Sequence, residues 1–131
     1  MPVDARLIKQ VYIPGRLFSV QPFTTEHIPS LFAKNERLVL HFETSSGPLI
    51  LVMVGATIVG NMGTSWSGDI KRHHEIHKED FLHQNIQLKK GEEFGYFKLG
   101  STVIMLTPKN IDWKMPIISG SRCSMGQSMA D

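Results

Sequence analysis

The stretch that decides the fold is Arg37-Leu38-Val39-Leu40-His41-Phe42, followed after a short gap by Leu49-Ile50-Leu51-Val52-Met53-Val54. In the first run, Leu38, Leu40 and Phe42 fall on one face, which is the alternation of a half-buried β-strand. The second run is short, apolar and rich in β-branched residues, and a glycine follows it. Both runs therefore predict strands, and the second is expected to be buried.

On either side of these runs, Gly and Pro occur often, and the apolar segments between them are short. This pattern favours a β-rich fold. Further strands are predicted at Leu7 to Ile13, Thr57 to Met62, Phe94 to Leu99 and Thr102 to Leu106, with edge strands at Ile117-Ile118 and Cys123 to Met129. The best helix candidate is Thr24 to Asn35, with Thr24 able to cap it, and Pro29 either limits this helix or shifts its start to that point. The fold class predicted is mainly β, a β-rich α+β domain of antiparallel strands with one or two short helices.

The polar middle of the chain, Gly63 to Lys90, holds four of the six histidines. Within it, Glu79 to Leu88 is either a short amphipathic helix or the arm of a hairpin, and a tight turn follows at Lys89-Lys90-Gly91-Glu92. His73, His74 and His77 have a spacing that can bind zinc from one helix face. Because the glutamate spacing of a zinc hydrolase is missing, a solvated polar loop without a metal is the favoured interpretation.

The length of 131 residues suits one domain. The net charge of +2 is too small to predict a nucleic-acid partner, and mild basicity is compatible with an anionic membrane surface. A single cysteine, Cys123, excludes an internal disulfide bond. No apolar run is long enough to span a bilayer, and the first residues lack the apolar core of a signal peptide.

Three acids, Asp4, Glu36 and Asp69, stand apart in the sequence and are predicted to be solvated surface charges. Lys114 suggests a carrier domain as an alternative, because biotin and lipoyl carriers present a lysine at the tip of a hairpin. Here Trp113 precedes that lysine, so a plain surface lysine is favoured over a modified one.

The dipeptide Gly100-Ser101 lies between two strand-like runs rather than in an ordinary turn. Gly100 has no Cβ, so its carbonyl carbon is open to attack. The Ser101 hydroxyl can attack that carbonyl and convert the amide into an ester. Elimination then breaks the chain, and hydrolysis of the resulting enamine leaves a pyruvoyl group on the new amino terminus. Such chemistry needs a base and an oxyanion donor.

Several segments together resemble the phosphatidylserine decarboxylase family, in the same order and at suitable spacing. They are Tyr12-Ile13-Pro14-Gly15-Arg16-Leu17-Phe18-Ser19-Val20, Leu31-Phe32-Ala33-Lys34-Asn35-Glu36-Arg37, Val54-Gly55-Ala56-Thr57-Ile58-Val59-Gly60, the run from Lys90 to Val103 with its Leu99-Gly100-Ser101-Thr102 motif, and the tail Met125 to Ala130. The resemblance covers nearly the whole chain except the histidine-rich loop.

The resemblance implies cleavage at Gly100-Ser101 into a β-chain part, residues 1–100, and an α chain, residues 101–131. Ser101 would become the covalent pyruvoyl cofactor and form a Schiff base with the amine of phosphatidylserine. Loss of carbon dioxide would then give phosphatidylethanolamine. The family's core resembles that of lipoyl carriers, as a barrel or sandwich. The implied location is peripheral, on the cytoplasmic face of the cell membrane, held there by a membrane-binding region upstream of the segments matched here.

Family members also carry an aspartate upstream, and a histidine pair just before the segment that Met1-Pro2 resembles. The aspartate and one histidine are thought to activate the serine, and Asp4 does not match that aspartate. We therefore expect the chain to be the C-terminal portion of one catalytic domain that cleaves itself slowly or not at all when alone. Two alternatives stay open at this point: a non-catalytic carrier-like module modified at Lys114, and an inactive remnant.

Overall fold

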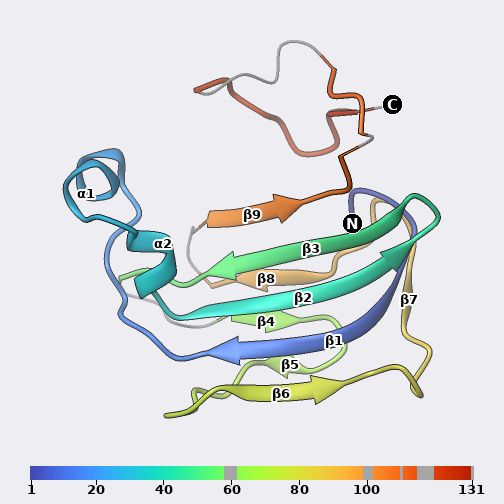
Figure 1. The fold of residues 1–131 in the computed structure, drawn as a ribbon, viewed down its shortest axis with the longest axis horizontal. Helices are drawn as coiled ribbons and strands as arrows, with labels where there is room; N and C mark the ends of the chain where they lie inside the picture. The colour runs from blue at the N-terminus through green and yellow to red at the C-terminus, as the bar shows by residue number, and fades with distance from the viewer. Residues whose placement is uncertain (58–61, 99–101, 110, 115–119, 131) are drawn as a thin grey trace.

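Two antiparallel β-sheets face one another in the computed structural model, which describes residues 1–57, 62–98, 102–109, 111–114 and 120–130. The six-stranded sheet has the order β6-β1-β2-β3-β9, with β7 also paired to β1, and the three-stranded sheet has the order β5-β4-β8. The smaller sheet lies behind the larger one in Figure 1. The strands are β1 (Ala5–Ile13), β2 (Arg37–Thr44), β3 (Gly47–Val54), β4 (Met62–Thr64), β5 (Gly68–Asp69), β6 (His77–Asp80), β7 (Gln87–Leu88), β8 (Gly95–Phe97) and β9 (Thr102–Leu106).

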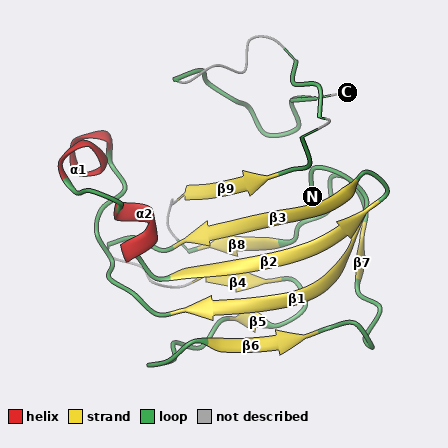
Figure 2. Cartoon of the chain, viewed as in Figure 1, coloured by secondary structure: helices red, strands yellow, loops and turns green. Residues whose placement is uncertain are grey.

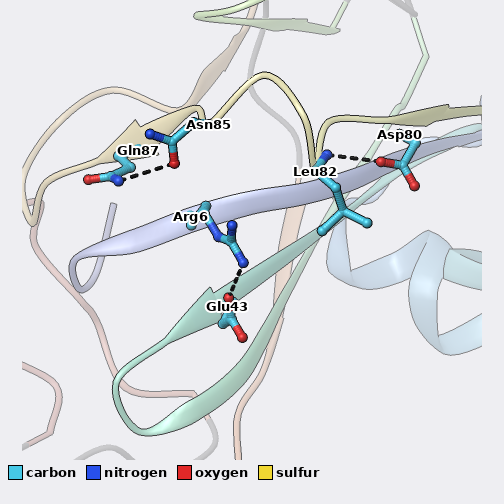
Figure 3. Close-up of polar contacts among 6 residues, drawn as sticks. All are labelled: Arg6, Glu43, Asp80, Leu82, Asn85 and Gln87. Atoms are coloured by element: carbon cyan, nitrogen blue, oxygen red, sulfur yellow. Dashed lines mark hydrogen bonds and ion pairs between the residues drawn. The ribbon is translucent and has the colours of Figure 1, made fainter.

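The long strands β1, β2 and β3 form the centre of the larger sheet. A two-residue turn joins β2 to β3, and Gly47 ends it with a φ of 114° that favours glycine. On the outer face, Arg6 of β1 lies opposite Glu43 of β2, and its Nη2 donates to Glu43 Oε2 at 2.7 Å. Figure 3 shows these two side chains pointing toward one another from neighbouring strands. Such cross-strand pairs help to set the register.

The core lies between the two sheets. Alternation along β2 turns Leu38, Leu40 and Phe42 inward, and each is at most 2% exposed. Met62 of β4 joins the same cluster from the smaller sheet, and Trp66 packs edge-on against Phe42 with ring centroids 6.1 Å apart. The strands predicted at Leu38–Phe42 and Leu49–Val54 are therefore confirmed, together with their buried faces.

Two short helices, α1 (Pro22–His27) and α2 (Leu31–Lys34), lie at one end of the larger sheet, as Figure 2 shows. The prediction of one continuous helix from Thr24 to Asn35 was wrong, as was its cap at Thr24, but α2 begins just after Pro29, in agreement with the alternative that Pro29 shifts the helix start. Pro22 stands in the first turn of α1, and Ser30 takes a left-handed conformation with φ 55° that interrupts the helix. Neither helix is long and apolar enough to cross a membrane, and the same holds throughout the described residues.

Other sequence predictions are corrected or narrowed by the structure. The described strands form an open sandwich and do not close into a barrel. Strands β6 and β7 occupy the polar middle, so the helix considered for Glu79 to Leu88 does not form. Of the strand predicted at Thr57 to Met62, Thr57 lies in a turn and Met62 belongs to β4, while residues 58–61 lie outside the described residues. Cys123 to Met129 is irregular, with one turn at Met125-Gly126, rather than a strand, and Ile117-Ile118 lie outside the described residues.

Strand β9 forms one edge of the larger sheet in the described part of the chain, and it exposes 52% of Leu106. Exposed apolar edge strands pair with other chains, and a charge on the edge opposes this pairing. We therefore expect the chain to self-associate and the variant Leu106→Lys to do so less, as measured by light scattering after size exclusion.

A matched control is Leu82→Lys, because Leu82 is 44% exposed but lies in a turn. This variant should leave the association unchanged. A monomeric wild-type chain, or an equal effect of both lysines, would contradict the role of the β9 edge.

Candidate functional site

Gly100 and Ser101, the cleavage site and pyruvoyl precursor implied by the sequence, lie outside the described residues. Their neighbours are described on both sides. Lys98 follows β8 in the three-stranded sheet, and Thr102 begins β9 in the six-stranded sheet. The chain therefore passes from one sheet to the other between Lys98 and Thr102. The contacts of Lys98 and Thr102 fix the two positions between which this segment runs.

On the Lys98 side, the anchor is the carboxylate of Asp69 at the end of β5. Tyr96 donates its hydroxyl to Asp69 Oδ1 at 2.7 Å, and Lys98 Nζ donates to Oδ2 at 2.5 Å. Tyr96 and Lys98 share one face of the strand because they are two residues apart. The bonds from Lys98 and then Tyr96 lower the pKa of Asp69. The same carboxylate raises the pKa of Lys98 and of Tyr96.

A glycine makes this arrangement possible. Gly63 of β4 lies opposite Tyr96 of β8, and a Cβ at Gly63 would come within 2.2 Å of the tyrosine ring. The ring can therefore lie flat over the backbone of β4 and bring its hydroxyl to Asp69 on the far strand. Sequence reasoning treated Asp69 as an isolated surface acid; it is exposed, but its partners come from β8, and nothing local in the sequence indicates them.

On the Thr102 side, a buried asparagine organises the end of the larger sheet. Asn35 Nδ2 donates to the carbonyl oxygens of Phe18 at 2.8 Å and Gly55 at 2.9 Å, and its Oδ1 accepts from the Phe18 amide at 3.0 Å. Asn35 is fully buried. Thr57 adds a further link, since its Oγ1 donates to the Leu17 carbonyl oxygen at 2.8 Å. The side chain of Asn35 therefore joins three segments that are far apart in the sequence.

Glu36, the next residue, is also fully buried, so its assignment as a solvated surface acid was wrong. Its Oε2 accepts from Arg72 Nε at 2.6 Å, and this bond raises the pKa of Arg72. Its other oxygen, Oε1, has no hydrogen-bond partner among the described residues. Burial, and secondarily the charge of Glu36, raise the pKa of the Tyr12 hydroxyl. A buried carboxylate oxygen without a partner is costly, which is typical of a site that receives another polar group.

This end of the sheet adjoins β9. The Gly55 amide donates to the Glu36 carbonyl oxygen at 2.8 Å, and Val54 pairs with Thr102. Four segments singled out in the sequence therefore meet here: Tyr12 to Val20, Leu31 to Arg37, Val54 to Gly60 in its described part, and the run that ends at Val103. Glu36 directly precedes β2 at this end of the sheet, and its carboxylate faces Arg72 and Tyr12 of β1.

His73, His74 and His77 do not converge as a set of metal ligands in the part of the chain that the structure describes. His73 and His77 stack with ring centroids 4.2 Å apart, and His73 also meets the edge of Tyr12 at 5.4 Å. No group of three His, Cys, Asp or Glu side chains in the described residues could hold a metal ion. His74 is exposed.

Lys114 lies in an irregular segment after β9, where its amide donates to the Met129 carbonyl oxygen at 2.9 Å. Lys114 is exposed, and residues 115–119 after it lie outside the described residues. Asp4 is exposed, as predicted, and it binds Lys89 Nζ at 3.1 Å and the Lys90 amide at 2.8 Å. Cys123 is exposed with a free thiol.

Comparison with known proteins agrees with the resemblance found in the sequence. The family model described as phosphatidylserine decarboxylase matches residues 1–131. A phosphatidylserine decarboxylase proenzyme of Legionella pneumophila (strain Philadelphia 1) is 51% identical over 134 residues, which covers 99% of this chain and 47% of the relative. Proteins of the same name from Herminiimonas arsenicoxydans and Actinobacillus pleuropneumoniae serotype 3 are 48% and 46% identical, covering 99% of this chain and 45% and 46% of their own lengths. The chain thus spans about half the length of these curated relatives.

Asn35→Ala should destabilise the domain, because it leaves buried backbone groups of Phe18 and Gly55 without partners. We expect a loss of about 2–4 kcal/mol in the free energy of unfolding, measured by urea denaturation. Gln21→Ala is the control, since Gln21 is exposed and its side chain makes no capping bond. Equal stability of the two variants would refute the organising role of Asn35.

Gly63→Ala should force the Tyr96 ring away from β4 and cost about 1–3 kcal/mol of stability. The same substitution in a Tyr96→Ala background should cost much less, because the overlapping ring is gone. A double-mutant cycle in thermal or urea unfolding measures this coupling. Additive effects would show that the contact between Gly63 and Tyr96 is not the constraint.

Proposed function

Because this chain belongs to the phosphatidylserine decarboxylase family, we propose that it is the C-terminal, catalytic part of an enzyme that converts phosphatidylserine into phosphatidylethanolamine. The observation that carries the proposal is the family match over residues 1–131, with about half of the residues identical to a proenzyme of that name. The chain covers 47% of that relative, so activity is proposed for an assembly with the remaining part rather than for the chain alone.

The proposed maturation step is cleavage between Gly100 and Ser101. Ser101 Oγ attacks the Gly100 carbonyl carbon, and an ester replaces the amide. Elimination of the Gly100 carboxylate leaves an enamine at the former serine. Hydrolysis of that enamine releases ammonia and leaves a pyruvoyl group on the chain that continues with Thr102. A pyruvoyl group supplies the electron-poor carbonyl that accepts the electrons left behind when carbon dioxide departs.

Two structural observations support this location. Lys98 and Thr102 are held by different sheets, so both ends of the intervening segment have defined anchors. Glu36, which precedes β2, also keeps a buried oxygen without a hydrogen-bond partner among the described residues, and its carboxylate faces Arg72 and Tyr12. Such an oxygen fits a site that binds further hydrogen-bond donors, including a hydroxyl group. In the proposal, Glu36 and Arg72 provide a fixed polar surface there.

The proposed partners are phosphatidylserine, the two chains formed by cleavage, and an anionic membrane surface reached through the part of the enzyme upstream of this match. The corresponding location is the cytoplasmic face of the cell membrane. The net charge of +2 is compatible with that surface but too small to carry the binding.

The test is a chimaera that joins the upstream half of the Legionella relative to this chain. We expect mass spectrometry to show cleavage at Gly100-Ser101 with a blocked amino terminus on the smaller fragment, and we expect the product to decarboxylate phosphatidylserine in mixed micelles. Ser101→Ala should abolish both the cleavage and the decarboxylation. An intact, inactive chimaera that melts cooperatively would refute the proposal.

The chain alone provides the second arm of this experiment. It should remain intact at 14.8 kDa, or cleave far more slowly than the chimaera. A complete break at Gly100-Ser101 in the isolated chain would show that no upstream residue is needed to activate Ser101.

A further inference from the structure

A polar pocket of about 270 Å³ opens between β1, β5 and β6. It adjoins the buried pair of Glu36 and Arg72, because the lining residue Tyr12 interacts with both side chains. Its walls carry both signs of charge and two imidazoles. The side chains that matter for the argument are Tyr12, Asp69, Lys71, His73, His77 and Glu79.

One carboxylate of the pocket, Glu79, is held rigidly. Its Oε2 accepts from Gln10 Nε2 at 2.6 Å, and Gln10 is only 3% exposed. The Gln10 Oε1 in turn accepts from Trp66 Nε1 at 3.1 Å. This chain of bonds fixes the Glu79 carboxylate from behind, so its other oxygen is positioned before any ligand arrives. That oxygen lies 3.5 Å from His77 Nε2.

The second carboxylate, Asp69, comes from the other sheet. Tyr96 and Lys98 hold it at 2.7 and 2.5 Å. Two carboxylates fixed on different elements are a preorganised arrangement for an ammonium group, which donates three hydrogen bonds. The charge-assisted bonds they form are the strong class of hydrogen bond.

The remaining walls offer donors to an anion. Lys71 carries an ammonium group, and each of the stacked imidazoles of His73 and His77 has at least one N–H in any protonation state. The buried ring of Tyr12 backs His73 and keeps the stack in place. A ligand with a negative charge alone would meet the two carboxylates, and one with a positive charge alone would meet Lys71. A ligand that carries both charges matches the whole lining.

We propose that this pocket binds a small zwitterion, with its ammonium group at Asp69 and Glu79 and its phosphate or carboxylate group at Lys71 and the two histidines. The head group of an aminophospholipid has this chemistry, and so does a soluble amino phosphate ester. The lipid reading rests on the proposed function. It is favoured because Asp69 also binds Lys98, two residues before Gly100. The pocket would hold the head group before the reaction, because an ammonium group bound by two carboxylates is not free to form a Schiff base.

Titration calorimetry of the whole, uncleaved chain tests the pocket with two probes, glycerophosphoserine and glycerol 3-phosphate. Both have a phosphate, but only the first has an ammonium group. We expect glycerophosphoserine to bind about tenfold more tightly, because only it can use the fixed carboxylates. Amide shifts in NMR spectra should map the binding to residues around Tyr12 and His77.

Substitutions of the lining residues then test which side chain binds which charged group of the ligand. Glu79→Gln keeps the bond with Gln10 but removes the charge, and it should make the two probes bind equally. Lys71→Gln should weaken both. The matched control is Lys78→Gln, because Lys78 lies between His77 and Glu79 on β6 but does not line the pocket; it should change neither affinity. Melting curves confirm that each variant is folded.

Vesicles of phosphatidylcholine with added phosphatidylserine, compared with added phosphatidylglycerol, separate the two sources of the zwitterion. Preference for phosphatidylserine that Glu79→Gln removes would support a lipid head group. Equal binding to both vesicles, with glycerophosphoserine still bound, would assign the pocket to a soluble ester.

Equal affinity of both soluble probes for the wild-type chain, or no binding of either, would overturn the inference. Because the calorimetry uses the uncleaved chain, it tests the pocket independently of the proposed function. Binding can be absent while the chimaera cleaves normally, and binding can be present while the chimaera stays intact.

Discussion

The hydrogen bonds of the Asn35 side chain are the constraint on which one whole end of the molecule depends. Loops that meet at the end of a sheet carry backbone groups that no strand can satisfy, and burying them without partners is costly. Asn35 satisfies an amide and two carbonyl oxygens of Phe18 and Gly55 from a fully buried position. Once these loops are joined, Glu36 is carried into the interior, where Arg72 binds one of its two oxygens.

The second constraint is the passage of the chain between two sheets. β8 belongs to the three-stranded sheet and β9 to the six-stranded sheet, so the residues between Lys98 and Thr102 connect layers that pack on a shared core. Each anchor uses its own sheet: Asp69 binds Lys98 on one side, and Val54 pairs with Thr102 on the other. The described residues on either side of this segment are therefore each held by a different sheet.

The strands could be predicted where alternation or β-branched runs were strong. β1, β2, β3 and β9 agree with the predicted runs to within two residues. The helix prediction failed because two local features, Pro22 in the first turn of α1 and the left-handed Ser30, divide the segment. The strand predicted at Cys123 to Met129 is absent: this segment is irregular with a turn at Met125-Gly126, and Ala130 after it forms only an isolated bridge with Trp113.

By itself, the sequence determined the family, the β-rich class and the dipeptide Gly100-Ser101 as the expected point of cleavage. These conclusions rest on local order along the chain: alternation, short motifs and their spacing. Only the tertiary structure showed which acidic side chains are buried or ion-paired. Glu36 and Asp69 look alike as isolated carboxylates, yet their partners Arg72 and Lys98 stand 36 and 29 residues away. Burial and ion pairing depend on which strands become neighbours, and no local pattern contains that information.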